Sequence, residues 1–453
     1  MIIPNARGEF FMQTKTIRLE KKFTPEDCKK CFYIDFEVPE NVEELRIRHT
    51  WTPKEEGNLD FGLVGADGRQ IGASGNVRQD VIISEKYATP GYDRCTPVAG
   101  KWKIIVGLDR VGNGVCAAYE IVFRFKEKRW LKGDTHSHTY NSDGKYSPED
   151  LIEKANKKGL DYLIITDHNN SIAAYNDYNN RDMLVLKGTE LTSFLGHINF
   201  WGVKQAFTKP YCVNSFEDFL PLYAQAKQNG AVISLNHPEC KNCGWHLPRE
   251  GFTYDCVEIW NGPQRIDNMT AIAWWHGELL KGKHLAAVGG SDYHKDYLVT
   301  DLLARPTTYV CAESCTAEDI LKALKNGNAF VTESVNGPKL FLTCGQAIQG
   351  DTVEFAPKTT VHIKAEGLKR KDRIVVYGND TVLYTYTAKA GEKVHEADIS
   401  VQEKGFVRAE ILTQYGAIRK IAYKTVMHFR LPADCKLPIP PFARCVSNPI
   451  YFV

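Results

Sequence analysis

Alternating hydrophobic and polar positions dominate the first part of the chain. Short runs such as FYIDFEV, LRIRHTW, WKIIVGL and AAYEIVFRF alternate with period two, and clusters of Gly, Pro and Asp separate them. Such alternation is typical of strands with one buried and one exposed face. We therefore expect residues 1–128 to form an N-terminal β-sandwich domain.

The pattern changes near Trp130, where continuous apolar runs alternate with helical segments. Ser147-Pro148-Glu149-Asp150 predicts the start of a helix, because it joins an N-cap serine to a proline and acidic residues in the first turn, and Gly159 predicts its end. DYLIITD predicts a buried strand that ends at His168, and MLVLKGTE, HINFWGV, AVISLNH, CVEIW and LAAVGGSD repeat this pattern. Further helices are expected at about 215–229, 268–281 and 317–326. Residues 129–335 are thus expected to form an α/β domain.

From about Val335 the runs are typical of strands again: LFLTC, TVHIKAEG, DRIVVYGND, VLYTYTA and VRAEILT. A proline-rich segment, LPADCKLPIPPFARC, predicts a loop before a closing strand in NPIYFV. We expect residues 336–453 to form a C-terminal β-sandwich domain.

Composition and charge exclude several classes of protein. The 57 basic and 55 acidic residues leave a net charge of +2, so no global field would draw the chain to nucleic acid or to an anionic membrane. No apolar run approaches the roughly 20 residues that span a bilayer, and the first residues lack the pattern of a signal peptide. Thirteen scattered cysteines fit a reducing compartment better than a disulfide framework. We expect a cytoplasmic protein with no membrane partner.

Histidines and carboxylates recur at the predicted strand ends in an order typical of a polynuclear metal site. Six of the nine histidines between residues 129 and 335 fall in such motifs. A core histidine usually stands alone, whereas these come with acids, and parallel strands bring their carboxyl ends to one edge. Imidazole and carboxylate suit Zn, Mn or Fe. The predicted ligands are His136, His138, Asp143, His168, Glu190, His197, His237, Asp292 and His294.

Two CxxC pairs, Cys28–Cys31 and Cys240–Cys243, each resemble half of a zinc ribbon. Neither has a matching half nearby in the sequence, so a structural zinc ion is not expected. Cys240 and Cys243 directly follow the ligand motif NHPE, and we expect them in a loop near the mouth of the site.

With these motifs, residues 130–335 resemble the polymerase and histidinol phosphatase (PHP) superfamily, and most closely its stand-alone carbaryl-hydrolase-like branch. The resemblance implies a distorted (β/α)7 barrel flanked by the two β-sandwich domains, with two or three divalent metal ions. It places His136, His138, Glu190 and Asp292 on a first metal. Glu190 would bridge to a second metal, bound by His197 and His237. A third would be bound by Asp143, His168 and His294.

The resemblance and the ligand set predict a metal-dependent phosphoesterase, which acts on a small-molecule phosphomonoester or phosphodiester through a metal-bound hydroxide. No serine or cysteine nucleophile is required. Arg249, Arg265 and His284 are candidate substrate contacts, with Lys283 and Lys295, although a solvated surface charge is the commoner role for such residues. Asp134 and Asp167 could orient ligating imidazoles or cap strand ends. His246 is a weaker candidate for a proton donor.

Two other functions are compatible with these residues. The same site could hydrolyse a carbamate, ester or amide, and a lack of cationic phosphate contacts would favour that reaction. A non-catalytic PHP binding module is less expected, because all nine ligand positions are filled. Nucleic acid is a possible but not a favoured substrate, since the chain has no long basic track. The sequence leaves the choice of metal and the oligomeric state open.

Overall fold

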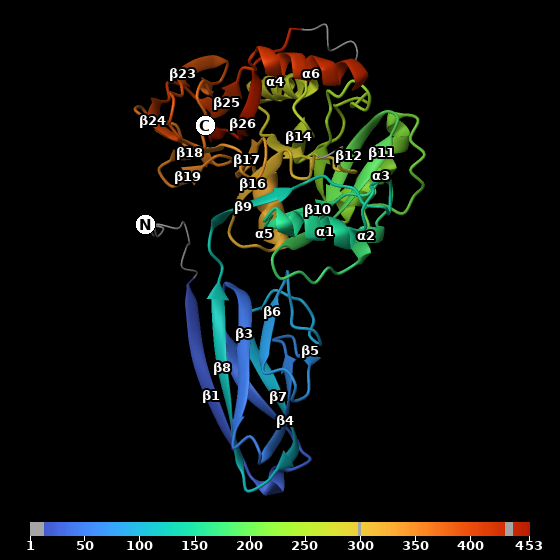
Figure 1. Ribbon diagram of the computed structural model, residues 1–453, viewed down its shortest axis with the longest axis vertical. Coiled ribbons are helices and arrows are strands. Elements are labelled where there is room, and N and C mark those ends of the chain that lie inside the picture. The colour runs from blue at the N-terminus through green and yellow to red at the C-terminus, as the bar shows by residue number, and fades with distance from the viewer. Residues whose placement is uncertain (1–12, 298–299, 431–437) are drawn as a thin grey trace. The chain divides into compact units, whose positions relative to one another are not determined.

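The computed structural model describes residues 13–297, 300–430 and 438–453. The chain divides into two compact units (Figure 1). The first contains the residues up to Arg129 together with Tyr178–Leu184 and Glu313–Ala317. The second contains Trp130–Asp177, Val185–Ala312 and Glu318–Val453. None of the described helices is long and apolar enough to cross a membrane.

The first unit is built from two four-stranded antiparallel sheets, in the orders β1-β8-β3-β6 and β2-β7-β4-β5. Their hydrophobic faces enclose one core, which includes Ile47, Phe61, Trp102 and Tyr119. This arrangement fits the sandwich that the alternation predicts. The strands are β1 (Thr14–Phe23), β2 (Cys31–Val38), β3 (Val42–Thr52), β4 (Gly57–Val64), β5 (Gln70–Ala73), β6 (Asp80–Ser84), β7 (Gly100–Val111) and β8 (Val115–Phe125), with a short 3-10 helix at Pro25–Asp27.

The second unit begins with a mixed row of strands in the order β15-β14-β13-β12-β11-β10-β9. The pairs β9/β10, β13/β14 and β14/β15 are parallel, whereas β12 is antiparallel to both β11 and β13. Beyond the strand ends Ser137 forms an isolated parallel bridge with Tyr293, so the segments after β9 and β15 lie side by side. The bounds are β9 (Arg129–Asp134), β10 (Tyr162–Ile165), β11 (Leu184–Ser193), β12 (Gly196–Trp201), β13 (Val232–Leu235), β14 (Cys256–Asn261) and β15 (Ala286–Gly290).

This strand row fits a mixed α/β domain, and the predicted helices lie within two residues of their expected bounds. The Ser147 hydroxyl caps the first of them by accepting a hydrogen bond from the Asp150 amide at 3.0 Å. The antiparallel β11/β12 pair interrupts a strict alternation of strand and helix, and the closer assignment to a (β/α)7 barrel stays a prediction. The helices are α1 (Pro148–Lys157), α2 (Ile172–Tyr175), α3 (Phe216–Gln228), α4 (Ile266–Leu280), α5 (Ala317–Asn326) and α6 (Ala417–Arg430).

The C-terminal strands continue the same large sheet, in the order β9-β16-β17-β26-β25-β22-β23, with β27 and β20 joined at its side. A four-stranded sheet, β19-β18-β21-β24, shares a hydrophobic core with these strands that includes Leu340, Ile363, Val376 and Ile411. The strands are β16 (Thr307–Ala312), β17 (Ala329–Thr332), β18 (Lys339–Cys344), β19 (Ala347–Ile348), β20 (Thr352–Val353), β21 (Thr360–Glu366), β22 (Arg373–Gly378), β23 (Thr381–Thr387), β24 (Val394–Ser400), β25 (Gly405–Thr413), β26 (Phe442–Ser447) and β27 (Ile450–Phe452).

Two features of this region differ from the sequence prediction. The helix α6 was not predicted, and the end of the proline-rich segment is not a loop, because Phe442–Ser447 forms β26 between β17 and β25. Residues 431–437 of that segment lie outside the described part of the chain.

Candidate metal centre

The nine predicted ligands come from the strand row and from the segments that follow its strands. His136 and His138 follow β9, and His168 follows β10. Glu190 lies in β11, and His197 lies in the antiparallel neighbour β12. The remaining residues are His237 after β13, Asp292 and His294 after β15, and Asp143 in the segment before α1. The row therefore brings together side chains that lie far apart in the sequence.

Glu190 lies at the centre of the group and is fully buried. Its Oε1 atom lies 3.3 Å from His136 Nε2 and 3.3 Å from His197 Nδ1. Its Oε2 atom lies 2.7 Å from His168 Nδ1. Burial alone would raise the pKa of Glu190, but the charges of His136 and His197 outweigh burial and hold that pKa well below its usual range. Glu190 is therefore ionised and faces imidazoles on several sides.

Two further carboxylates complete the group. Asp292 Oδ1 lies 3.0 Å from His138 Nε2. Asp143 Oδ1 lies 3.3 Å from His168 Nε2 and 3.1 Å from His294 Nε2. His138, Asp143, His168 and His294 offer ligand atoms that all lie within 4.8 Å of one another. The same holds for the set of His136, His138 and Asp292, and for the set of His136, Glu190 and His237.

Unpaired buried atoms show that this donor set fits metal ions. Buried polar groups are nearly always hydrogen-bonded, and an unmet one is costly. Several atoms here form no hydrogen bond of suitable geometry with any residue that the structure describes, although some lie close to another ligand atom: His136 Nε2, His138 Nδ1 and Nε2, Glu190 Oε2, His237 Nε2 and Asp292 Oδ1. Divalent cations between the imidazoles and carboxylates would satisfy such atoms together.

Glu258 is a site residue that the sequence analysis missed. Its Oε1 atom lies 3.0 Å from His136 Nδ1, and its Oε2 atom accepts hydrogen bonds from the His237 amide and from Asn261 Nδ2, both at 3.1 Å. Asn236 has a similar place, because its Nδ2 donates to Glu190 Oε1 at 2.7 Å. A lone glutamate within the apolar run CVEIW was the signal that could have indicated Glu258.

Asp134 and Asp167 accept hydrogen bonds from the loops near the site, and within the described part of the chain neither is hydrogen-bonded to the imidazole ring of a predicted ligand. Asp134 accepts hydrogen bonds from the backbone amides of Ser291 and Ala304, at 2.9 and 2.7 Å. Burial raises the pKa of Asp134 to about 6. Asp167 accepts from the amide and the hydroxyl of Thr139, both at 2.7 Å. Both acids therefore fix the loops that carry the ligands, as the strand-end alternative predicted.

Arg265 lies at the mouth of the site. It lines a cavity of about 370 Å³ together with Asp143, Asp292, His294 and Lys295. Its Nη2 atom donates to Asn261 Oδ1 at 2.8 Å, and its Nε atom has no hydrogen-bond partner among the described residues. Arg265 therefore brings a guanidinium group to this cavity.

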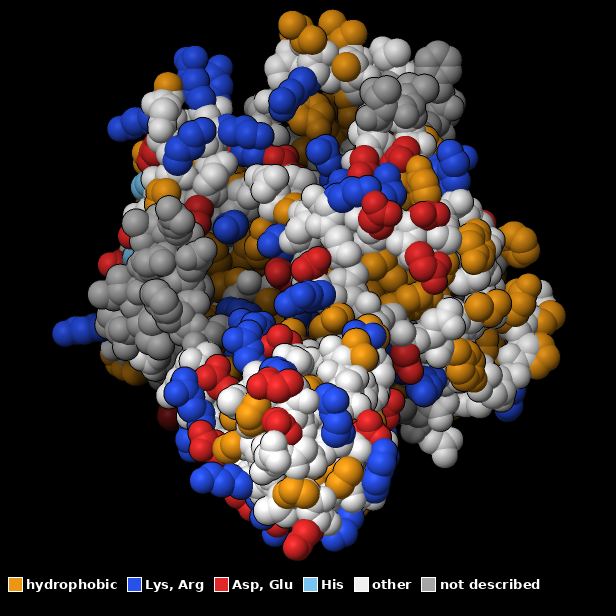
Figure 2. All heavy atoms as spheres, turned by 60° about the horizontal axis from the view of Figure 1, so that its bottom comes forward, with side chains coloured by type: hydrophobic (Ala, Val, Ile, Leu, Met, Phe, Trp, Pro, Cys, Tyr) orange, Lys and Arg blue, Asp and Glu red, His pale blue; other side chains and the backbone are white. Residues whose placement is uncertain are grey.

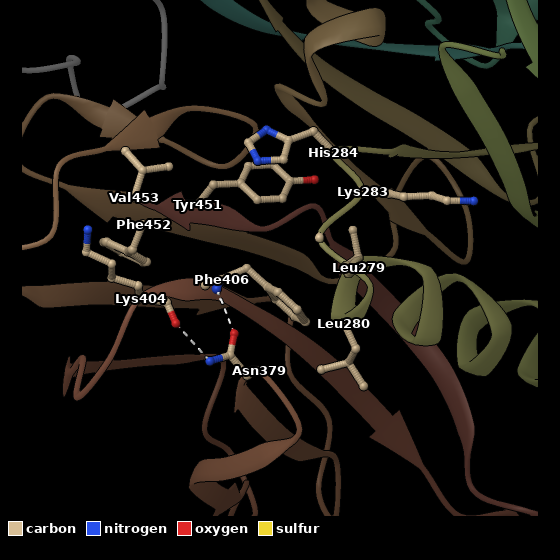
Figure 3. Close-up of a pocket in the computed structure, with 12 residues that line it drawn as sticks. Leu279, Leu280, Lys283, His284, Asn379, Lys404, Phe406, Tyr451, Phe452 and Val453 are labelled. Carbon is tan, nitrogen blue, oxygen red and sulfur yellow. Dashed lines mark hydrogen bonds between the residues drawn. The ribbon is translucent and has the colours of Figure 1, made fainter.

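The other substrate-contact candidates lie elsewhere or have other partners. Arg249 donates to Glu239 Oε1 at 2.7 Å and lies over the ring of Trp274. His284 is not part of the ligand group, because it stacks on Tyr451 in a separate cavity next to the end of α4 (Figure 3). Lys283 pairs with Glu278, and His246 is exposed.

Comparison with known proteins supports the assignment of this part of the chain. Residues 134–238 match the family model of the PHP domain. Seven of the nine predicted ligands lie within those residues, and Asp292 and His294 lie beyond them. No curated protein matches the chain. The closer likeness to the carbaryl-hydrolase-like branch stays a prediction.

Several solved structures are distantly similar. A two-domain protein from Bacteroides vulgatus with a predicted PHP-like metal-dependent phosphoesterase is 20% identical, with a TM-score of 0.38, and the match covers 63% of this chain and 91% of that one. A candidate metal-dependent phosphoesterase from Bifidobacterium adolescentis is 17% identical, with a TM-score of 0.28, over 38% and 90% of the two chains. An amidohydrolase from Chromobacterium violaceum is 17% identical, with a TM-score of 0.27, over 36% and 87%. Likeness at this level adds nothing to the argument from the site.

Proposed function

We propose that this protein is a metal-dependent phosphoesterase, built on a PHP barrel, that acts on small-molecule phosphoesters. The convergence of nine histidine and carboxylate side chains, with buried donor and acceptor atoms left unpaired, carries this proposal. The PHP match over residues 134–238 supports the hydrolase class. Bound divalent ions would lower the pKa of coordinated water and stabilise negative charge on the substrate oxygens.

The residues of the chain have separate roles in this proposal. Glu190 and Asp292 lie between imidazoles, and each can serve more than one ion. Glu258 would orient the His136 ring through its contact with Nδ1, which leaves Nε2 for a metal ion. At the mouth, the guanidinium of Arg265 and the ammonium of Lys295 would bind the phosphoryl oxygens, and arginine can do so with two parallel hydrogen bonds.

Carbamate, ester or amide hydrolysis is the second candidate. Arg249, one of the two arginines expected to contact phosphate, is already paired with Glu239 and packs on Trp274. A site with fewer free cations accepts a neutral carbonyl substrate more easily. Arg265 and Lys295 at the mouth make the phosphoester the better supported substrate.

Nucleic acid is a less suitable substrate. The net charge is only +2, and on the face shown in Figure 2 lysine and arginine side chains are interspersed with aspartate and glutamate side chains. Affinity for a polyanion depends on several basic groups that neutralise successive phosphates. A small phosphoester needs only the groups at the mouth of the site.

Purified full-length protein, stripped of metal and reloaded with manganese or zinc, tests the proposal. It should release p-nitrophenol from p-nitrophenyl phosphate or its diester faster than from p-nitrophenyl acetate or a matched carbamate. His136→Ala should abolish the activity, whereas His284→Ala should leave it unchanged, because His284 lies in another cavity. Protein with verified bound metal that hydrolyses none of the phosphoesters would refute the proposal.

A further inference from the structure

The loop that follows the predicted ligand His237 places a pair of thiols on the Nδ1 side of its ring. Cys240 Sγ lies 2.9 Å from Cys243 Sγ, and Cys243 Sγ lies 3.7 Å from His237 Nδ1. Both cysteines are free thiols. Cys240 is buried and Cys243 is half-buried. The metal site proposed above makes no use of either sulfur.

The backbone of the loop keeps the two thiols together. The Cys240 amide donates to the His237 carbonyl at 2.9 Å, and the Trp245 amide donates to the Pro238 carbonyl at 3.1 Å. A Cβ atom on Gly244 would lie 2.4 Å from the Cys240 carbonyl oxygen, so the turn needs glycine at this position. The turn thus keeps the two cysteines close together, which favours reaction between them over reaction with other thiols.

His237 connects this thiol pair with the ligand group. Its Nε2 atom lies 3.7 Å from Glu190 Oε1, and its Nδ1 atom faces Cys243. An imidazole that ligates through Nε2 carries a proton on Nδ1 and needs an acceptor for it. Cys243 Sγ lies where that acceptor is needed.

We propose that Cys240 and Cys243 form a reversible disulfide, with a peroxide as oxidant. We also propose that this disulfide weakens the contact that positions the His237 imidazole as a metal ligand. One thiolate attacks a peroxide oxygen, which gives a sulfenic acid and hydroxide. The second thiol then displaces that oxygen as water and forms the S–S bond. Two thiols and one hydrogen peroxide thus give one disulfide and two waters, and two electrons pass from sulfur to peroxide. An S–S bond is about 2.05 Å long, so the two sulfurs must move from their 2.9 Å separation, and the contact of Cys243 Sγ with His237 Nδ1 changes.

Thiol mapping of the full chain tests the first half of the proposal. Reduced protein is treated with hydrogen peroxide, its free thiols are alkylated, and peptides are analysed by mass spectrometry. The Cys240–Cys243 disulfide should form before the other cysteines react, and dithiothreitol should reverse it. Cys28→Ser/Cys31→Ser removes the chain's other CxxC pair and is the matched control, since Cys28 donates to the Asp109 carbonyl and not to a second thiol.

Metal retention tests the second half, which rests on the proposed function. Loss of a partner behind a ligating histidine typically costs about 10–100-fold in metal affinity or activity. Oxidised wild-type protein should lose metal to a chelator about tenfold more easily than reduced protein. Cys240→Ala/Cys243→Ala should show no dependence on peroxide, and circular dichroism should show that it is folded.

Each result has a distinct meaning. If both cysteines remain alkylatable after oxidation, or are protected before it by a bound zinc ion, the disulfide is refuted. If the disulfide forms without a change in metal retention, the link to His237 is refuted. Reduced, metal-loaded protein that forms the disulfide but hydrolyses no phosphoester would refute the proposed function and leave the disulfide intact.

Discussion

Replacement of Glu258 by glutamine should weaken metal binding without removing any of the nine predicted ligands. The Glu258 carboxylate faces three donors: His136 Nδ1 at 3.0 Å, and the His237 amide and Asn261 Nδ2, both at 3.1 Å. Glutamine keeps the size of the side chain but has one acceptor oxygen and one donor group. In either orientation its NH2 group faces at least one donor, and the negative charge behind His136 is lost.

The magnitude follows from these contacts. A buried donor left without its acceptor costs about 1–3 kcal/mol. Loss of the residue that orients a ligating histidine typically lowers metal affinity or activity about 10–100-fold, which corresponds to about 1.4–2.8 kcal/mol. The two estimates agree, and the substitution disturbs the contacts that position His136 and the His237 backbone without removing a ligand atom. Glu258→Gln should therefore bind metal about 10–100-fold more weakly than the wild type.

The assay is metal retention against graded chelator, measured by elemental analysis, with kcat on p-nitrophenyl phosphate as a second readout. Glu410→Gln is the matched control, because Glu410 is similarly buried but pairs with Arg408 at 2.5 Å, outside the ligand group. That variant should lose stability and keep its metal. Equal metal retention by Glu258→Gln and the wild type would refute the orienting role.

Three further predictions concern other parts of the chain. Burial, with a smaller contribution from Lys54, lowers the pKa of His49 from 6.5 to about 4. His49 therefore does not reduce the free energy of unfolding above pH 6.5, but as the pH falls below 6.5 the unfolded state binds a proton that the folded state does not, and the protein loses stability. Denaturant unfolding between pH 8 and pH 5 should show a loss of about 2 kcal/mol that His49→Leu lacks. Arg265→Gln should raise KM for aryl phosphates about 10–100-fold, and Arg249→Gln should not. Ser147→Ala should cost about 1 kcal/mol of stability in the same unfolding assay, since it removes the cap of α1.

The ligand group could be predicted from the sequence because it follows from strand periodicity. Most of the ligand motifs lie at the end of an apolar run, and neighbouring strand ends meet at one edge of a sheet. The contact of Glu258 with His136 could not be predicted in this way, because the two residues are 122 positions apart. The run CVEIW shows that a charge lies in a buried strand but not which side chain it faces.

The placement of the substrate-contact candidates shows a second limit of motif reading. Arg265 immediately precedes α4, and His284 follows its other end. A helix of 15 residues is about 22 Å long, so its two ends cannot both border one small cavity. The predicted helix at 268–281 already contained this information. The sequence suggests both Arg265 and His284 as substrate contacts only because each side chain can carry a positive charge.

The C-terminal strands contribute to the sheet that carries the site. The change of pattern near Val335 marks a new set of strands, but the sheet does not end there, because β17 pairs with β26. The Asn448 amide then accepts from the Ala287 amide at 2.7 Å and donates to the Ala329 carbonyl at 3.0 Å, which joins β15 to β17. Since Asp292 and His294 directly follow β15, a residue near the end of the chain helps to fix the strand that presents them. The ligand motifs show none of this dependence, because it arises from a side chain that lies 161 positions after Ala287 in the sequence.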